Sequence, residues 1–313
     1  MKNILYLIIP CYNEEEVLPI TIKEVNKKIK YLIKKNIINK DSKILFVDDG
    51  SKDKTWNIIK ETNKKNNLFK GIKLSKNKGH QNALLAGLSY SLEKADIVIS
   101  MDADLQDDIN AIDKMIQEYK KGTEIVYGVR SSRKKDSFFK RTTAQSFYKL
   151  MNKLGTNLIY NHADYRLLSN KALGYLLEYN EVNLFLRGII PEIGLKTSIV
   201  YYERKERVKG ITKYPLKKML SFALEGITSF SIKPLKLITT LGLIISFISF
   251  IIMIYSLIVK ILGQTVPGWT FTIISIWLIG GIQMLFLGII GEYIGKIYSE
   301  TKHRPKYFIE EEL

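Results

Sequence analysis

Residues 95–108 are ADIVISMDADLQDD, a short apolar run that leads directly into a group of acidic side chains. The β-branched run Ile97–Met101 predicts a buried strand. Comparable runs lie at Ile4–Ile9, Lys43–Val47, Gly71–Leu74 and Glu124–Gly128. Apolar residues recur near helical spacing in the intervening segments Glu15–Lys35, Lys54–Asn66, Gln81–Glu93 and Ile109–Lys121. This alternation predicts an α/β fold with a Rossmann-like, mostly parallel sheet covered by helices on both faces.

Polar residues follow three of these strands. The first strand leads into Pro10-Cys11-Tyr12-Asn13-Glu14, the second into Asp48-Asp49-Gly50-Ser51 and the fourth into Asp102-Ala103-Asp104-Leu105-Gln106. Ligands of open α/β sheets bind beyond the carboxyl ends of the strands. We therefore expect several strands to bring acidic groups to one rim of the sheet.

Asp102 and Asp104 are one residue apart, a spacing that suits a divalent cation. Two acids in a turn are more often solvated or cap a helix. Here they directly follow a strand and accompany a second acidic strand end, which favours a functional site. Oxygen ligands fit Mg²⁺ or Mn²⁺, which would screen the charge of a diphosphate, and no Cys and His pattern supports zinc.

The composition limits the class of protein. The 313 residues include 48 Lys and Arg, 31 Asp and Glu and one cysteine, with a formal net charge of +17. These figures exclude a disulfide-stapled secreted module and a disordered chain. The charge indicates an anionic partner, for which nucleic acid, a phosphorylated small molecule and a lipid surface all qualify. No nucleic-acid-binding motif is evident, so we expect no nucleic acid partner.

Two long apolar runs, Leu235–Leu262 and Thr270–Ile290, stand near the C-terminus, separated by a short turn that contains Pro267 and Gly268. Each is long enough to cross a bilayer, and the alternative is a pair of buried core helices. Lys233 and Lys236 precede the pair, and Lys296 and further basic residues follow it. The positive-inside rule then places both ends in the cytoplasm. The first ten residues are too short and too soon polar for a signal peptide, so we expect a cytosolic catalytic part of a two-span cell-membrane protein.

The quoted motifs resemble those of a known enzyme family. The segments IIPCYNEE, FVDDGSKDKT, NKGHQNALLAG and SMDADLQDD are similar to family 2 glycosyltransferases of the GT-A fold. Two later segments, GVRSSRKKDSFFKR and ERKERVKGITKY, together with the apolar hairpin, resemble the polyprenyl-phosphate glycosyltransferases, which act on undecaprenyl or dolichyl phosphate. The resemblance covers nearly the whole chain. It implies four parts: a GT-A domain in residues 1–214, an interfacial helix in 215–234, a transmembrane hairpin in 235–298 and a cytosolic tail in 299–313.

The resemblance also implies roles for individual residues. A nucleotide-sugar site would contain Pro10, Tyr12, Asn13, Glu14, Asp49, Asp102, Ala103 and Arg130. The metal would be held by Asp102, Asp104 and Gln106, with Asp104 the most direct ligand. The lipid phosphate would meet Arg133, Lys140, Arg141, Arg204, Arg207 and Lys213. Arginine suits phosphate because its planar fork matches two oxygens.

Asp104 and Asp164 are the expected catalytic residues. Asp164 aligns with an aspartate described in the family as the base. A lipid phosphate is already largely dianionic at pH 7, so Asp164 could instead orient the acceptor or stabilise positive charge at the anomeric carbon. Arg166 could pair with Asp164 structurally, and we expect His80 to cap a helix or donate a hydrogen bond rather than to catalyse.

The expected reaction is an inverting transfer of one sugar from a nucleotide sugar, with a UDP-sugar favoured, to a polyprenyl phosphate. Two alternatives remain open: a GDP-mannose-dependent mannose synthase, and a non-catalytic membrane protein that binds nucleotide or serves as a scaffold. A processive polysaccharide synthase is disfavoured because no Trp stands in a Gln-x-x-Arg-Trp motif. Gly280, Gly281, Gly288 and Gly291 could allow close helix approach in a homo-oligomer.

Overall fold

The computed structural model describes residues 2–131, 162–182, 185–204, 233–262 and 268–313. The chain divides into two compact units. The first contains the sheet with its helices and includes the C-terminal segment Arg304–Leu313, and the second contains the two long C-terminal helices. Each unit is described by itself.

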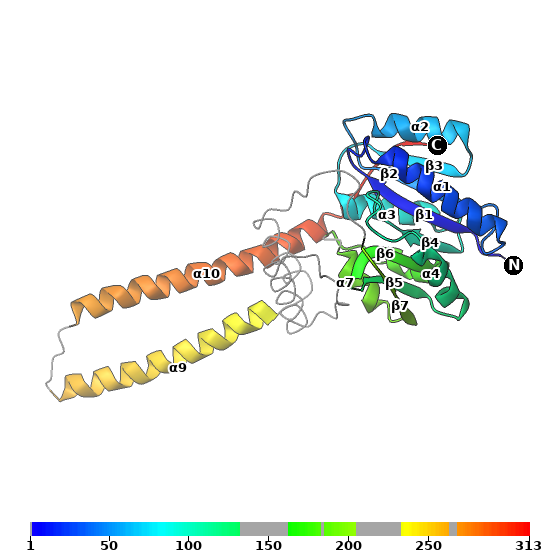
Figure 1. The fold of residues 1–313 in the computed structure, drawn as a ribbon. Coiled ribbons are helices and arrows are strands. Elements are labelled where there is room, and N and C mark those ends of the chain that lie inside the picture. The colour runs from blue at the N-terminus through cyan, green and yellow to red at the C-terminus, as the bar shows by residue number, and fades with distance from the viewer. Residues whose placement is uncertain (1, 132–161, 183–184, 205–232, 263–267) are drawn as a thin grey trace. The chain divides into compact units, whose positions relative to one another are not determined.

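The first unit is built on an eight-stranded mixed sheet in the order β7-β5-β6-β4-β1-β2-β3-β8 (Figure 1). Its strands are β1 (Leu5–Cys11), β2 (Lys43–Asp48), β3 (Phe69–Leu74), β4 (Ile97–Ser100), β5 (Ile125–Arg130), β6 (His162–Ser169), β7 (Thr197–Tyr202) and β8 (Ile309–Glu312). Strands β1 to β4 are mutually parallel, and β5 is parallel to β7. Strand β6 runs antiparallel to β4 and β5, and β8 runs antiparallel to β3.

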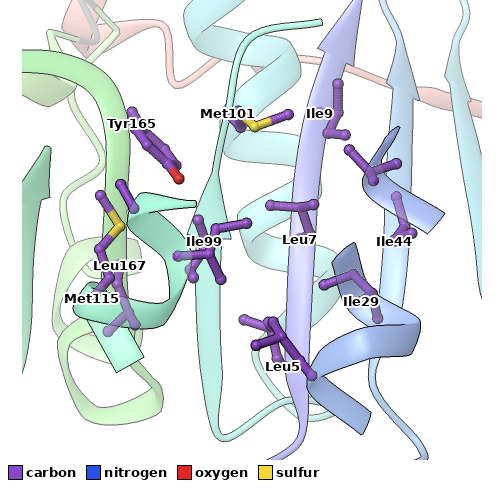
Figure 2. Packing of buried hydrophobic residues seen from close by; sticks show 14 of the residues in the cluster. Leu5, Leu7, Ile9, Ile29, Ile44, Ile99, Met101, Met115, Tyr165 and Leu167 are labelled. Carbon is purple, nitrogen blue, oxygen red and sulfur yellow. The ribbon is translucent and has the colours of Figure 1, made fainter. Parts of the chain in front are cut away.

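Helices cover both faces of this sheet. The helices are α1 (Leu18–Lys34), α2 (Thr55–Lys65), α3 (His80–Ser91), α4 (Ala111–Lys120), α6 (Asn170–Leu177) and α7 (Leu186–Glu192). On one face, Leu5, Leu7 and Ile9 of β1 share a buried cluster with Ile29 of α1 and Met115 of α4 (Figure 2). On the other face, α3 approaches so closely that a Cβ at Gly87 would lie 2.5 Å from Ile8. The predicted α/β fold, with a mostly parallel sheet covered on both sides, is confirmed.

The C-terminal residues complete the edge of the sheet. Ile309 of β8 lies opposite Leu74 of β3, and the backbone N–H of Leu313 donates to the carbonyl of Gly71 at 2.9 Å. The indole Nε1 of Trp56 donates to Glu311 at 2.9 Å. An uncovered edge strand offers unpaired N–H and C=O groups to other chains, and β8 removes that exposure on β3. The segment expected only as a tail therefore contributes a strand to the first unit.

The second unit contains α9 (Lys233–Ile261) and α10 (Trp269–Thr301), which run in opposite directions (Figure 1). Each contains a window long and apolar enough to cross a membrane, Pro234–Ile252 and Leu278–Thr301, and neither window is buried. The two predicted apolar helices are confirmed.

Candidate active site

The loops after β1 and β2 are fastened to each other by hydrogen bonds. The backbone N–H of Asn13 donates to Ser51 Oγ at 3.0 Å, and the N–H of Lys52 donates back to Asn13 Oδ1 at 2.9 Å. The N–H of Glu14 donates to Thr55 Oγ1 at 2.9 Å. Asn13 has a positive φ of 53°, a conformation that asparagine tolerates better than most residues. These contacts hold the predicted Tyr12-Asn13-Glu14 loop at the rim, where the Tyr12 side chain remains exposed.

Asp49 is buried and serves as an anchor for the loop before α3. Asp49 is only 2% exposed. Its two carboxylate oxygens accept hydrogen bonds from the backbone N–H groups of Lys78 at 2.7 Å and Gly79 at 2.9 Å. Burial raises the pKa of Asp49, and the two backbone hydrogen bonds offset part of that shift. Gly50 lets the loop pack this closely, since a Cβ there would lie 2.6 Å from Asn77 N.

The acidic segment after β4 adopts a strained turn. Leu105 has a positive φ of 55°, which costs a bulky residue about 1–2 kcal/mol. The turn is fixed from within and from outside: the N–H of Gln106 donates to Asp104 Oδ1 at 3.2 Å, and Thr21 Oγ1 donates to the carbonyl of Ala103 at 2.6 Å. Strain of this kind persists only where the surroundings enforce it, and it is common at functional sites.

A second set of contacts joins this turn to the end of β7. The buried Asp107 accepts a hydrogen bond from Tyr202 Oη and faces Arg130 Nη2 at 3.8 Å. Arg130 Nε in turn donates to Tyr202 Oη at 3.4 Å. Burial, with a further contribution from Asp102, raises the pKa of Asp107 to about 6. Arg204 Nη2 donates to Gln106 Oε1. The predicted residues Arg130, Gln106 and Arg204 are thus brought together.

Asp164 of β6 lies near Asp102, which follows the neighbouring strand β4. Strand β6 pairs Arg166 with Ser100, the last residue of β4, in antiparallel register, so Asp164 and Asp102 each lie two residues beyond this pair. The Ser100 hydroxyl donates to the carbonyl of Asp164. His80, the first residue of α3, lies between the two acids, with Nε2 at 3.8 Å from Asp102 Oδ1 and 3.6 Å from Asp164 Oδ2. Asp164, a predicted catalytic residue, therefore lies at the same rim of the sheet as the acidic segment Asp102–Asp104.

Two arginines surround the carboxylate of Asp164. Arg166 Nη2 donates to Oδ1, as expected for a structural ion pair. Arg187 donates from Nε to Oδ1 at 3.2 Å and from Nη2 to Oδ2 at 2.9 Å. Burial alone would raise the pKa of Asp164, but Arg187 and Arg166 outweigh it and hold that pKa well below its usual range. A carboxylate in this environment is a poor proton acceptor, which argues against the role of a base.

The acids after β4 fit a hard divalent cation. In the described parts of the chain, no three His, Cys, Asp or Glu side chains gather closely enough to hold a metal ion by themselves. Magnesium sites next to phosphates need only one or two carboxylates, because phosphate oxygens and water supply the other ligands. The side chain of Asp102 is 38% exposed and Asp104 is half-buried, so both carboxylates are accessible for such a shared site.

Five residues predicted to bind the lipid phosphate lie outside the described residues: Arg133, Lys140, Arg141, Arg207 and Lys213. Pro10 and Ala103 are buried in the strand and turn that lead to the rim, so they would act through the backbone.

Sequence reasoning missed three residues of this site, Asp107, Tyr202 and Arg187. Asp107 was inside a quoted motif, and its position one residue after Gln106 was the available signal. Nothing local in the sequence connects Arg187 of α7 with Asp164 of β6, which lies 23 residues earlier.

Comparison with known proteins agrees with this geometry. Residues 6–177 match the family described as glycosyl transferase family 2, which covers more than half of the chain. The chain belongs to glycosyl transferase family 2. Residues 233–297 match a second family, described as the GtrB C-terminal hairpin. The predicted family and its hairpin-bearing subgroup are confirmed, and the protein is a glycosyltransferase.

Full-length relatives include proteins named for the lipid on which they act. The bactoprenol glucosyl transferase of Shigella phage SfV is 40% identical over 311 residues, covering 98% of each chain. A prophage bactoprenol glucosyl transferase homolog of Escherichia coli K12 is 40% identical over 305 residues, covering 97% of each chain. An uncharacterized glycosyltransferase of Bacillus subtilis, YkoT, is 56% identical over 312 residues, covering 100% of this chain and 93% of the relative.

Proposed function

We propose that this glycosyltransferase moves one sugar from a nucleotide sugar to a polyprenyl phosphate at the cytoplasmic face of a membrane. One observation carries the proposal: the relatives called bactoprenol glucosyl transferases match the chain over both the catalytic part and the C-terminal hairpin. A protein that only bound nucleotide would not need the acids of the rim, and Asp102, Asp104 and Asp164 are all in place. The relatives named glucosyl transferases favour glucose as the sugar, and we propose a UDP-sugar as its donor.

The membrane arrangement follows from the two apolar helices. We propose that α9 and α10 span the bilayer within residues 235–298, that residues 215–234 lie at its surface and that the catalytic domain and the tail are cytosolic. Tail residues of β8 pair with β3, so the tail and the sheet must lie on the same side of the membrane. This pairing supports a hairpin with both ends on one side.

In the proposed reaction the acceptor phosphate attacks the anomeric carbon in line and the nucleoside diphosphate leaves with inversion. A divalent cation held by Asp102 and Asp104, Mg²⁺ or Mn²⁺, would screen the negative charge that develops on the diphosphate. Arg130 is held toward the rim by Tyr202 and Asp107 and would bind phosphate oxygens. Asp164 would stabilise positive charge at the anomeric carbon. The acceptor needs no base because a phosphate monoester is largely dianionic at pH 7.

The test is transfer of labelled sugar into lipid by the purified full-length chain in lipid nanodiscs. UDP-glucose, UDP-N-acetylglucosamine and GDP-mannose are each supplied with undecaprenyl phosphate and Mg²⁺ or Mn²⁺, and the anomeric configuration of the product is read by NMR. We expect a UDP-sugar to be used, an inverted product and loss of transfer with a chelator. Transfer from GDP-mannose alone would identify a mannose synthase, and no lipid product from any donor would refute the proposal.

Asp104→Ala tests the metal assignment, because it removes one proposed ligand. Metal stabilisation of charge is worth several kcal/mol, so turnover should fall at least about 100-fold. Asp41→Ala is the matched control, since Asp41 is an exposed aspartate at the opposite end of β2 from the rim. Equal activity in the two variants would remove Asp104 from the site.

A further inference from the structure

Arg187 makes a two-point contact with a residue of the proposed catalytic site. Its Nε and Nη2 groups reach the two different oxygens of Asp164, at 3.2 and 2.9 Å. Paired N–H donors in a planar fork fix the orientation of a carboxylate as well as attracting its charge. Arg187 thus sets the plane of the Asp164 carboxylate. Arg166 Nη2, by contrast, contacts only one of the two carboxylate oxygens, Oδ1.

The two arginines differ in how they are placed. Arg166 is 2% exposed, and its Nη1 also donates to the carbonyl of Leu186 at 3.4 Å. The side chain of Arg187 is 35% exposed, so it lies nearer the protein surface than Arg166. Arg166 therefore acts as a fixed internal support, while Arg187 holds the carboxylate from the more exposed side.

The start of α7 is itself anchored, which gives the Arg187 side chain a defined origin. The N–H of Leu186 donates to Gln81 Oε1 at 3.3 Å, and its carbonyl accepts from Arg166. Helix α3 thus supplies His80 and Gln81, one facing Asp164 and the next holding the helix that carries Arg187. The contacts connect three elements, α3, β6 and α7, around one carboxylate.

Charge balance gives the same assignment. Asp102, Asp104 and Asp164 bring three carboxylates to one rim, and Arg187 provides a counter-charge there. Without Arg187, Asp164 would lose two of its hydrogen bonds and much of the attraction that opposes its repulsion by Asp102. Its carboxylate would then turn toward its remaining partners, Arg166 and His80.

We propose that Arg187 is a positioning residue that holds the carboxylate of Asp164 in the orientation required for sugar transfer and acts through Asp164 rather than by binding substrate. This inference rests on the proposed function, because it assigns Asp164 to the transfer site. Electrostatic catalysis depends on charges fixed before the reaction, and a displacement of about 1 Å can cost about 100-fold in rate.

A double-mutant cycle of Arg187→Ala and Asp164→Asn distinguishes action through Asp164 from independent action. Turnover of the donor found in the transfer panel and its KM are measured for the wild type, both single variants and the double variant. We expect Arg187→Ala to lower kcat about 10- to 100-fold with the donor KM changed less than about twofold. In the Asp164→Asn background, Arg187→Ala should change kcat less than about threefold, because its partner is already neutral.

Two further proteins complete the design. Arg187→Lys keeps the charge but offers a single point of contact, so it should retain part of the activity; if Arg187→Ala does not fold, Arg187→Lys takes its place in the cycle. Lys171→Ala removes an exposed cation on α6 and should leave kcat unchanged. Effects on kcat that multiply in the double variant, or a large rise in donor KM, would overturn the proposal by showing direct substrate contact.

The melting temperatures of the wild type, the two single variants and the double variant report the contact between Arg187 and Asp164 without any turnover. Coupled residues give shifts that do not add, so additive shifts would also overturn the proposal. A wild type that makes no lipid product with any donor refutes the proposed function, and the melting cycle still decides whether Arg187 holds Asp164. The two failures are therefore distinguishable.

Discussion

Gly50 is the position where a single methyl group should damage both the fold and the donor site. It has a φ of +66°, and a Cβ would lie 2.6 Å from Asn77 N and 2.7 Å from Lys76 C. Both are backbone atoms that cannot rotate away, so Gly50→Ala must displace the segment that carries the N–H of Lys78. That N–H donates to the buried Asp49 at 2.7 Å.

The expected loss has two parts. A residue with a Cβ in the left-handed region costs about 1–2 kcal/mol relative to glycine. Weakening a hydrogen bond to the Asp49 carboxylate costs about 1.5–3 kcal/mol more. Gly122→Ala isolates the first part, because Gly122 has a φ of +84° and the nearest atom to its Cβ would be the flexible end of Lys196 at 4.0 Å.

The assay is thermal unfolding of the full-length protein in detergent at one scan rate, followed by measurement of the donor KM. Gly50→Ala should melt about 3–12 °C below Gly122→Ala, since a domain of this size loses about 2–4 °C per kcal/mol. Its donor KM should rise, whereas that of Gly122→Ala should not. Gly50→Asn should stay destabilised, because asparagine tolerates a positive φ but brings the same Cβ. Equal melting of Gly50→Ala and Gly122→Ala would refute the reasoning.

Three other predictions concern the first unit. Burial, with the nearby acids, raises the pKa of the Cys11 thiol well above its usual value, so it should resist alkylation in the native protein from pH 7 to 9 and react after denaturation, as counted by mass spectrometry. Deleting residues 309–313 uncovers the edge of β3 and should lower the melting temperature and increase light scattering, while Asp41→Ala, at an exposed residue before β2, should do neither. Ser169→Ala removes the Oγ that caps α6 by accepting the N–H of Ala172, so it should cost about 1 kcal/mol, or about 2–4 °C of melting temperature.

The first part of the fold could be predicted because its signals are local. Strands β1, β2 and β4 are apolar runs bounded by polar turns, and the structure places β4 at Ile97–Ser100, within one residue of the predicted Ile97–Met101. Helix α3 begins at His80, one residue before its predicted start at Gln81. In each case the hydrophobic period and the turn residues fix the element without help from distant parts of the chain.

The missed elements depend on long-range pairing. Strand β8, Ile309–Glu312, contains three glutamates, and each of them faces a lysine of a distant segment. Lys73 lies 2.9 Å from Glu310, Lys60 lies 2.7 Å from Glu311 and Lys94 lies 3.8 Å from Glu312. No periodicity within the tail indicates a strand. Arg187 was missed for the same reason, since its contact with Asp164 exists only once α7 has packed beside β6.

The structure also relates two motifs that the sequence assigned to different substrates. Gln106 was placed with the metal and diphosphate, and Arg204 with the lipid phosphate, yet Arg204 Nη2 donates to Gln106 Oε1. Two residues earlier, Tyr202 donates to Asp107. Tyr202 at the end of β7 and Arg204 just after it therefore hold two neighbouring residues of the turn after β4, Asp107 and Gln106. These contacts lie at the start of the segment proposed to bind the acceptor. In-line transfer requires the attacking oxygen within about 3–3.5 Å of the anomeric carbon. Shared side-chain contacts between the two motifs are a direct way to bring the two substrates that close.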